Sequence, residues 1–242
     1  MKKKYLFLIF SFSILHAQEY IDYGNPIIVL TEYNPDALIL YYDSPTFCLY
    51  DTGIIIYKDG ELNDYVSVKL NEKESDGFIS SLNIAEAFYD LPRDIATSTW
   101  TDQFYNEITL NLESSARVEV YGNLRDNDEC RDNTPKPFLN LYDKLIEYKN
   151  SNTEIWRPKK IEVMLREFNY SREEPAKWSA DWPSLSDSNY SEEDDFISIY
   201  LDSHYYEQFM NFLNGLDENQ AVEINGKTYA VTYRFPFPNL EN

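Results

Sequence analysis

Short apolar runs separated by turn residues predict β-strands in the first part of the chain. Residues 37–42 (ALILYY) and 45–50 (PTFCLY) are apolar runs of strand length, and residues 53–60 (GIIIYKDG) end in an Asp-Gly turn. Residues 65–70 (YVSVKL) alternate apolar and polar positions, as a half-buried strand does. We therefore expect antiparallel strands in this region.

Capping residues and apolar positions at helical spacing predict two helices. Asn71 is a good N-cap, and Glu74 stands where a capping box needs its second partner. Phe78 and Leu82 are four residues apart and would share the buried face of this helix. Residues 135–151 predict the second helix through a stripe of apolar residues along one face.

Two stretches of the chain resemble each other. Residues 65–82 and 196–213 align without a gap, so that strand positions, a capping residue and apolar helix positions coincide. A hairpin pattern follows each of them, at residues 108–122 and 221–235. The chain therefore predicts a strand–helix–hairpin unit that occurs twice, with chance similarity of short segments as the alternative.

The whole pattern predicts an α+β fold of two related units, each with an antiparallel sheet and a helix packed on one face. Residues 19–150 would form the N-terminal unit and residues 151–242 the C-terminal unit, joined through the polar segment 149–160. Residues 234–238 (RFPFP) predict an edge strand that prolines end.

The first 18 residues have the pattern of a secretory signal peptide. Three lysines at positions 2–4 precede the apolar run 5–15, and Ala17 is a small residue suited to the cleavage site. The run is too short to span a bilayer, which needs about 20 residues. We expect a secreted or periplasmic protein whose mature chain has no transmembrane segment, with an uncleaved anchor as the alternative.

The chain is strongly acidic, and this narrows its partners. Its formal charge of −21 becomes −24 when the three lysines of the signal peptide are removed. Such a charge repels phosphate backbones, so we expect no binding to nucleic acid. It favours cations, basic proteins or neutral ligands as partners. The alternative is that the charge only keeps the protein in solution.

The two cysteines, Cys48 and Cys130, would reside in an oxidising compartment, which allows a disulfide between them. Closing a loop of this length would stabilise the fold by about 4 kcal/mol in the chain-entropy model. Nothing in the sequence places the two residues side by side, so the pairing stays open.

Several common chemistries lack their sequence signals. The closest glycines, Gly53 and Gly60, are seven residues apart, whereas nucleotide-binding loops need clustered glycines. No nucleophile elbow is present, and His204 is the only histidine left after the signal peptide. We expect His204 to lie at the start of a helix without a catalytic role, and we expect no nucleotide ligand.

Acidic residues leave two further chemistries open. Asp126, Asp128 and Asp132 lie in a turn-rich stretch that offers oxygen ligands for calcium, although it lacks the glycine and the final glutamate of a helix–loop–helix calcium loop. We favour a solvated acidic loop, with a calcium site as the alternative, and we expect no other cofactor. A glycoside hydrolase needs only two suitably spaced carboxylates, which the sequence alone does not select.

The long segment 169–195 carries Trp178, Asp181 and Trp182 in polar surroundings. Exposed tryptophans stack on sugars or anchor protein partners, while the alternative is that they fold back onto the core. Together these features predict an exported binding or interaction module for a protein or glycan, with no evident catalytic motif. A carboxylate-based hydrolase acting on glycans is the alternative.

Overall fold

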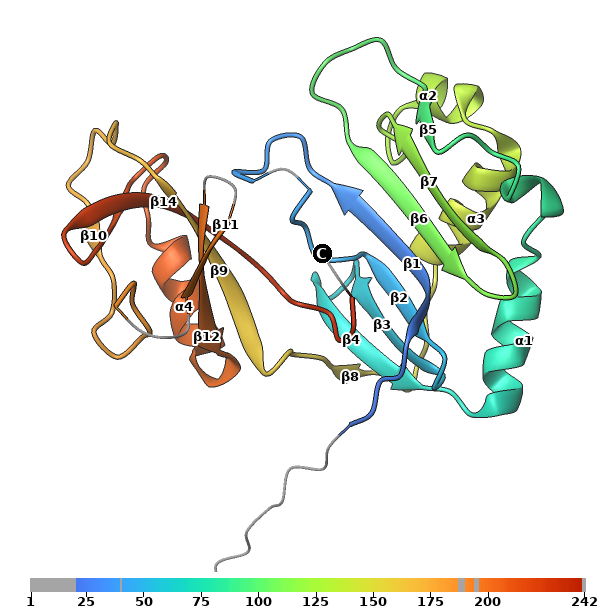
Figure 1. Cartoon of the computed structure of the whole chain (residues 1–242), viewed down its shortest axis with the longest axis horizontal. Helices are drawn as coiled ribbons and strands as arrows, with labels where there is room; N and C mark the ends of the chain where they lie inside the picture. The colour runs from blue at the N-terminus through green and yellow to red at the C-terminus, as the bar shows by residue number, and fades with distance from the viewer. Residues whose placement is uncertain (1–20, 40, 187–189, 194–195, 241–242) are drawn as a thin grey trace, which may run out of the picture.

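The computed structural model describes residues 21–39, 41–186, 190–193 and 196–240, with the backbone alone for 190–193. The predicted signal peptide, residues 1–18, lies outside the described residues. The described chain is an α+β protein with two sheets and few helices, which confirms the predicted fold class (Figure 1). No helix in the described part of the chain is long and apolar enough to cross a membrane.

The first sheet has eight strands within the described residues, in the order β5-β7-β6-β1-β2-β3-β4-β8. Only β5 and β7 are parallel neighbours in it. The strands are β1 (Pro26–Tyr33), β2 (Phe47–Tyr50), β3 (Ile54–Asp59), β4 (Asp64–Lys69), β5 (Asp94–Ala96), β6 (Tyr105–Asn111), β7 (Ser115–Tyr121) and β8 (Glu154–Ile155). The helical elements on one face are α1 (Glu72–Leu82), the 3-10 turn η1 (Glu86–Phe88), α2 (Asp128–Asn133) and α3 (Lys136–Ile146).

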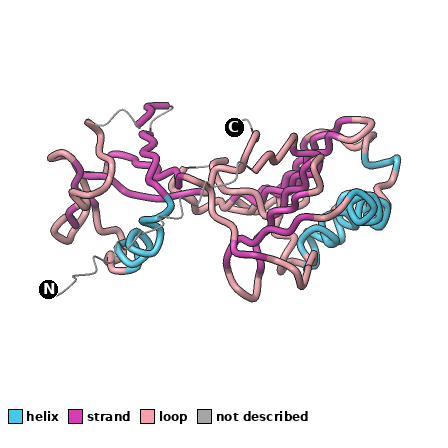
Figure 2. Tube along the Cα trace, turned by 90° about the horizontal axis from the view of Figure 1, so that it is seen from below, coloured by secondary structure: helices cyan, strands magenta, loops and turns pink. Residues whose placement is uncertain are grey.

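The second sheet has six strands within the described residues, in the order β10-β13-β14-β9-β12-β11. The strands are β9 (Lys160–Glu167), β10 (Ala176–Lys177), β11 (Tyr190–Glu193), β12 (Phe196–Asp202), β13 (Val222–Ile224) and β14 (Lys227–Arg234). The 3-10 turn η2 (Ser203–Tyr205) leads into α4 (Tyr206–Asn214), whose Phe209 is fully buried against this sheet. Figure 2 shows the helices set against one side of the strands.

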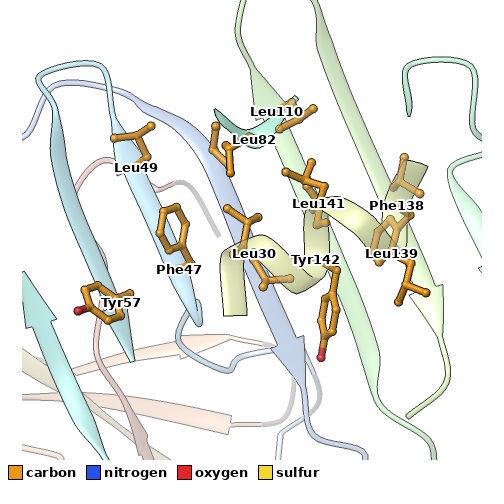
Figure 3. Packing of buried hydrophobic residues seen from close by; sticks show 14 of the residues in the cluster. Leu30, Phe47, Leu49, Tyr57, Leu82, Leu110, Phe138, Leu139, Leu141 and Tyr142 are labelled. Carbon is orange, nitrogen blue, oxygen red and sulfur yellow. The ribbon is translucent and has the colours of Figure 1, made fainter. Parts of the chain in front are cut away.

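The main core lies between the first sheet and its helices. Leu30 and Phe47 point from the strands towards Leu141 and Tyr142 of α3 (Figure 3). All four side chains are at most 2% exposed. Burying an apolar side chain of this size contributes about 1.5–3 kcal/mol, so this layer stabilises the packing of α3 on the first sheet.

The predicted cap of α1 is confirmed. The Asn71 side chain accepts a hydrogen bond from the Glu74 N–H at 3.0 Å, and the Glu74 carboxylate accepts one from the Asn71 N–H at 2.9 Å. Two donors that the helix leaves unpaired are thus satisfied, which is worth about 1 kcal/mol for such a cap. The helix ends at Asn83, which adopts the left-handed conformation with φ of 48°.

Two crossing segments join the sheets. The C-terminal strap, residues 235–240, leaves β14 and returns to the helix-free face of the first sheet (Figure 1). There Phe235 and Phe237 pack with Trp156, Cys48 and Tyr50. The crossing loop, residues 34–46 without residue 40, leaves β1 and covers the helix-free face of the second sheet. The strap thus follows a strand of the second sheet but packs on the first, and the crossing loop follows a strand of the first sheet but packs on the second.

Three strand predictions need correction. Residues 37–42 form no strand among their described positions; instead Ile39 is buried, and Leu38 partly buried, in a cluster with Met164 and Phe196. Residues 26–33, for which no strand was predicted, form β1 near the middle of the first sheet. The strand that ends at Arg234 is not an edge strand, since β14 lies between β13 and β9.

The two units share the order strand, helix and hairpin, but their hairpins join the sheets differently. In the N-terminal unit the leading hairpin strand, β6, pairs with β1. In the C-terminal unit the trailing strand, β14, pairs with β9. The internal repeat and the boundary near residue 150 therefore stay predictions.

The disulfide between Cys48 and Cys130 does not form, and both thiols are free and buried. Cys48 belongs to the cluster under the strap, on the helix-free face of the first sheet. Cys130 belongs to the core on the opposite, helix-covered face. The sheet lies between the two thiols, so the pairing that the sequence left open is not made.

Candidate functional site

A groove of about 1070 Å³ runs over the helix-free face of the first sheet. Its floor is formed by β1, β6 and β7, and its sides by the crossing loop, the C-terminal strap and the start of β5. Ligand pockets usually measure about 300–1,000 Å³, so this groove has room for an extended ligand.

Strand alternation explains why the floor is polar. Successive side chains of a strand point to opposite faces, so the apolar positions of β1, β6 and β7 pack on the helices and the intervening positions lie on the helix-free face, where most of them line the groove. The register aligns these intervening positions across the three strands. They are Val29, Thr31 and Tyr33 on β1, Tyr105, Glu107 and Thr109 on β6, and Arg117, Glu119 and Tyr121 on β7.

A tyrosine row crosses one end of this face. Tyr33, Tyr105 and Tyr121 are paired across the three strands, and the rings of Tyr105 and Tyr121 lie 4.8 Å apart. Tyr41 of the crossing loop packs on this row, with its ring 5.1 Å from Tyr33 and 5.2 Å from Tyr105. The Tyr41 backbone has φ of 65°, a conformation that is rare for a large side chain. Tyr41 is nevertheless 46% exposed, so its ring is held open to solvent.

Next to the tyrosines lies a charged row. Glu107 accepts hydrogen bonds from the Arg117 guanidinium at 2.7 Å, and its own side chain is 10% exposed. Glu119 is the register partner of Glu107 on the neighbouring strand. Burial, then the charges of Glu107 and Asp94, raise the pKa of the Glu119 carboxyl, whereas Arg117 opposes this shift. Two carboxylates of different surroundings thus face the same groove.

Two further acidic or phenolic groups line the groove. Burial, followed by the charge of Glu107, raises the pKa of Tyr33 to about 12, so its hydroxyl stays a hydrogen-bond donor at neutral pH. Burial also raises the pKa of Asp43, although its carboxylate accepts a hydrogen bond from the Asn34 N–H at 3.0 Å. These groups give the groove a mixed surface of aromatic rings and hydrogen-bonding groups.

The tryptophan segment lies on the C-terminal unit, away from this groove. Trp182 is 5% exposed and packs edge-on against Phe209, with the ring centroids 5.7 Å apart. Trp178 is half-buried, and its indole N–H donates to the Pro183 carbonyl at 2.8 Å. Asp181 is exposed beside them. Both rings fold back onto the core, and a role of this segment in binding stays a prediction.

The acidic stretch for which calcium was the alternative does not gather its side chains. Asp126, Asp128 and Asp132 are exposed, and Asp128 opens the short helix α2. In the described part of the chain, no three His, Cys, Asp or Glu side chains converge as a metal site requires. His204 is exposed at the start of η2, with its imidazole 2.6 Å from Asp202.

The groove residues were missed at the level of sequence. In residues 105–111 and 115–121, polar side chains alternate with apolar ones. This alternation indicates strands, but polar positions of this kind also occur on any sheet face that is exposed to solvent. What distinguishes this face is its enclosure by the strap and the crossing loop, and these contacts join residues far apart in the chain.

In comparisons with protein families, curated proteins and solved structures, nothing matches the chain. We therefore infer function from the chemistry of the groove.

Proposed function

We propose that the protein is an exported binding protein that holds an extended polar ligand, part of a protein or a glycan, in the groove of the first sheet. The observation that carries this proposal is the groove itself, about 1070 Å³ in volume and lined by tyrosines, carboxylates and guanidinium groups. The signal-peptide pattern of residues 1–18 supports export. The charge of −21 argues against nucleic acid as the ligand.

The groove-filling variant Thr109→Trp tests this proposal. Thr109 lies on the groove floor between Val29 and Arg117, so an indole there would occupy the space of the ligand. Gln208→Trp is the matched control, because Gln208 is exposed on α4. The mature protein and both variants would be screened against peptide and glycan arrays. We expect Thr109→Trp to lose at least about tenfold in affinity, or about 1.4 kcal/mol, for each ligand found. Ligands that bind both variants equally would contradict the proposal.

A second candidate, a carboxylate-based hydrolase acting on glycans, is favoured by the Glu107–Glu119 pair. Glu107 and Glu119 are register partners on antiparallel strands and present their side chains on the same face, and a glycosidase needs two carboxyl groups that face one cleft. The raised pKa of Glu119 suits a general acid. Glu119→Gln should abolish cleavage of the glycan and leave glycan binding intact. Absence of product from the unchanged protein with glycans that it binds would contradict this candidate.

A further inference from the structure

The groove is lined by more negatively charged side chains than positively charged ones. Five carboxylates and three guanidinium groups belong to its lining. Two of the guanidinium groups are already held by carboxylates, Arg117 by Glu107 and Arg234 by Glu162, at 2.5 Å in each case. The carboxylates of the lining are Asp43, Asp51, Asp94, Glu107 and Glu119. The groove therefore adds an acidic surface to a chain that is acidic throughout.

Glu107 and Glu119 are the carboxylates of this set that lie next to the tyrosine row, and Arg117 already holds Glu107. Glu119 precedes Tyr121 by two positions on the same face of β7, so it lies next to the tyrosine row. Its charge is also among the smaller causes that raise the pKa values of Tyr33 and Tyr41, for both of which burial is the largest cause. Within the described part of the chain, its carboxylate forms no ion pair and accepts no hydrogen bond. Its own raised pKa shows that the surroundings disfavour its negative charge, and a cation placed beside it would reverse that effect.

The tyrosine row supplies the second half of a cation site. The faces of aromatic rings attract ammonium and guanidinium groups within about 6 Å of the ring centre. Tyr33, Tyr41 and Tyr105 meet in one cluster with ring centroids 5.1 and 5.2 Å apart, and Tyr41 is 46% exposed. A long, flexible side chain entering the groove would thus contact ring surface along its stem and Glu119 at its charged end.

We propose that the groove binds a basic segment of a partner protein, with a lysine or arginine side chain seated between Glu119 and the tyrosine row. This inference rests on the proposed binding function and names its ligand class. Charge complementarity selects the occupant, since the hydroxyl groups of a neutral glycan could donate hydrogen bonds to the Glu119 carboxylate but could not neutralise its charge. The field of the whole chain would also attract such a segment from a distance.

The test uses the mature protein and a short peptide of alternating lysine and glycine, with its glutamate counterpart and a neutral hexasaccharide as comparison ligands. Affinity is measured by calorimetry at rising sodium chloride, because the Debye length falls from about 10 Å at 0.1 M to about 3 Å at 1 M. We expect binding of the lysine peptide only, weakening with salt. Glu119→Gln should lower its affinity about tenfold, and the matched variant Glu129→Gln on α2 should not.

Two variants of Tyr41 test the role of the tyrosine row. They also keep the inference testable if Glu119→Gln does not fold. Tyr41→Leu removes the ring and should weaken peptide binding, whereas Tyr41→Phe keeps the ring and should bind normally. Equal losses in Glu119→Gln and Glu129→Gln would overturn the inference, since the overall charge would then be responsible. Binding of the hexasaccharide alone in the groove would overturn it but keep the proposed function. If none of these ligands binds, the inference of a basic ligand is wrong. The array screen with Thr109→Trp then tests the proposed binding function separately.

Discussion

The C-terminal strap forms one side of the groove, and Phe237→Ala tests whether it is firmly attached. The Phe237 side chain is 6% exposed, and its ring lies 4.8 Å from that of Trp156 and 5.6 Å from that of Tyr65. Buried Phe-to-Ala substitutions cost about 3–5 kcal/mol, and a terminal segment that can relax into the vacated space belongs at the lower end. We therefore expect a loss of about 3 kcal/mol in the free energy of unfolding.

The assay is urea unfolding, followed by tryptophan fluorescence and by far-ultraviolet circular dichroism. In a parallel thermal melt, a loss of this amount would lower the melting midpoint of a chain of this size by about 6–12 °C. Tyr170→Ala is the control, because Tyr170 is 87% exposed and its loss should change stability by less than about 0.5 kcal/mol. A loss below about 1 kcal/mol in Phe237→Ala, similar to that of the control, would refute the attachment of the strap.

Three further predictions concern buried groups and strain. Burial alone would raise the pKa of Glu32, but its bonds to Arg125, Tyr142 and Thr46 hold it below the usual 4.5. The stabilisation by this carboxylate is thus complete above about pH 4.5 and is lost as the pH falls through the lowered value. Glu32→Gln should cost about 2 kcal/mol near pH 7, and this difference should shrink in acid-denaturation series. Cys48, whose pKa burial raises to about 12, and Cys130 should react with a thiol reagent only after unfolding, and a reductant should leave the melting midpoint unchanged. Tyr41→Asn should keep stability within about 1 kcal/mol in urea unfolding, because relief of about 1–2 kcal/mol of left-handed strain offsets the lost ring contacts.

Each of these predictions has a contradicting outcome. If the difference in free energy of unfolding between Glu32→Gln and the unchanged protein stayed constant down to the acid transition, the negative charge of Glu32 would not be what stabilises the fold. Rapid labelling of either thiol in the folded protein would contradict the burial of both. A loss above about 2 kcal/mol in Tyr41→Asn would mean that the ring contacts outweigh the strain.

Local signals of the sequence predicted the elements well wherever local chemistry determines them. The capping box of Asn71 and Glu74 and the two hairpins depend on residues close in sequence, and the structure has both. Residues 37–39 show the limit, because an apolar run predicts burial but not the element that is buried. Ile39 is buried, and Leu38 partly buried, against the second sheet, which begins more than a hundred positions later.

The groove depends even more on distant contacts. Glu107 and Glu119 become neighbours through the register of one hairpin, which a closer reading of the turn could have suggested. Their enclosure, however, needs the strap at the other end of the chain and the crossing loop. No periodicity within a short window reports such contacts, so the sequence favoured the tryptophan segment, whose large side chains attract notice by type alone.

The most direct test of the account is an NMR titration of the mature protein with the lysine–glycine peptide, followed by backbone amide shifts. We predict that the largest shifts fall on β1, β6, β7 and the strap, with Glu119 and Tyr41 among the residues most affected. Shifts confined to the segment around Trp178 and Trp182, with the groove amides unchanged, would contradict the central claim that the first sheet carries the binding site.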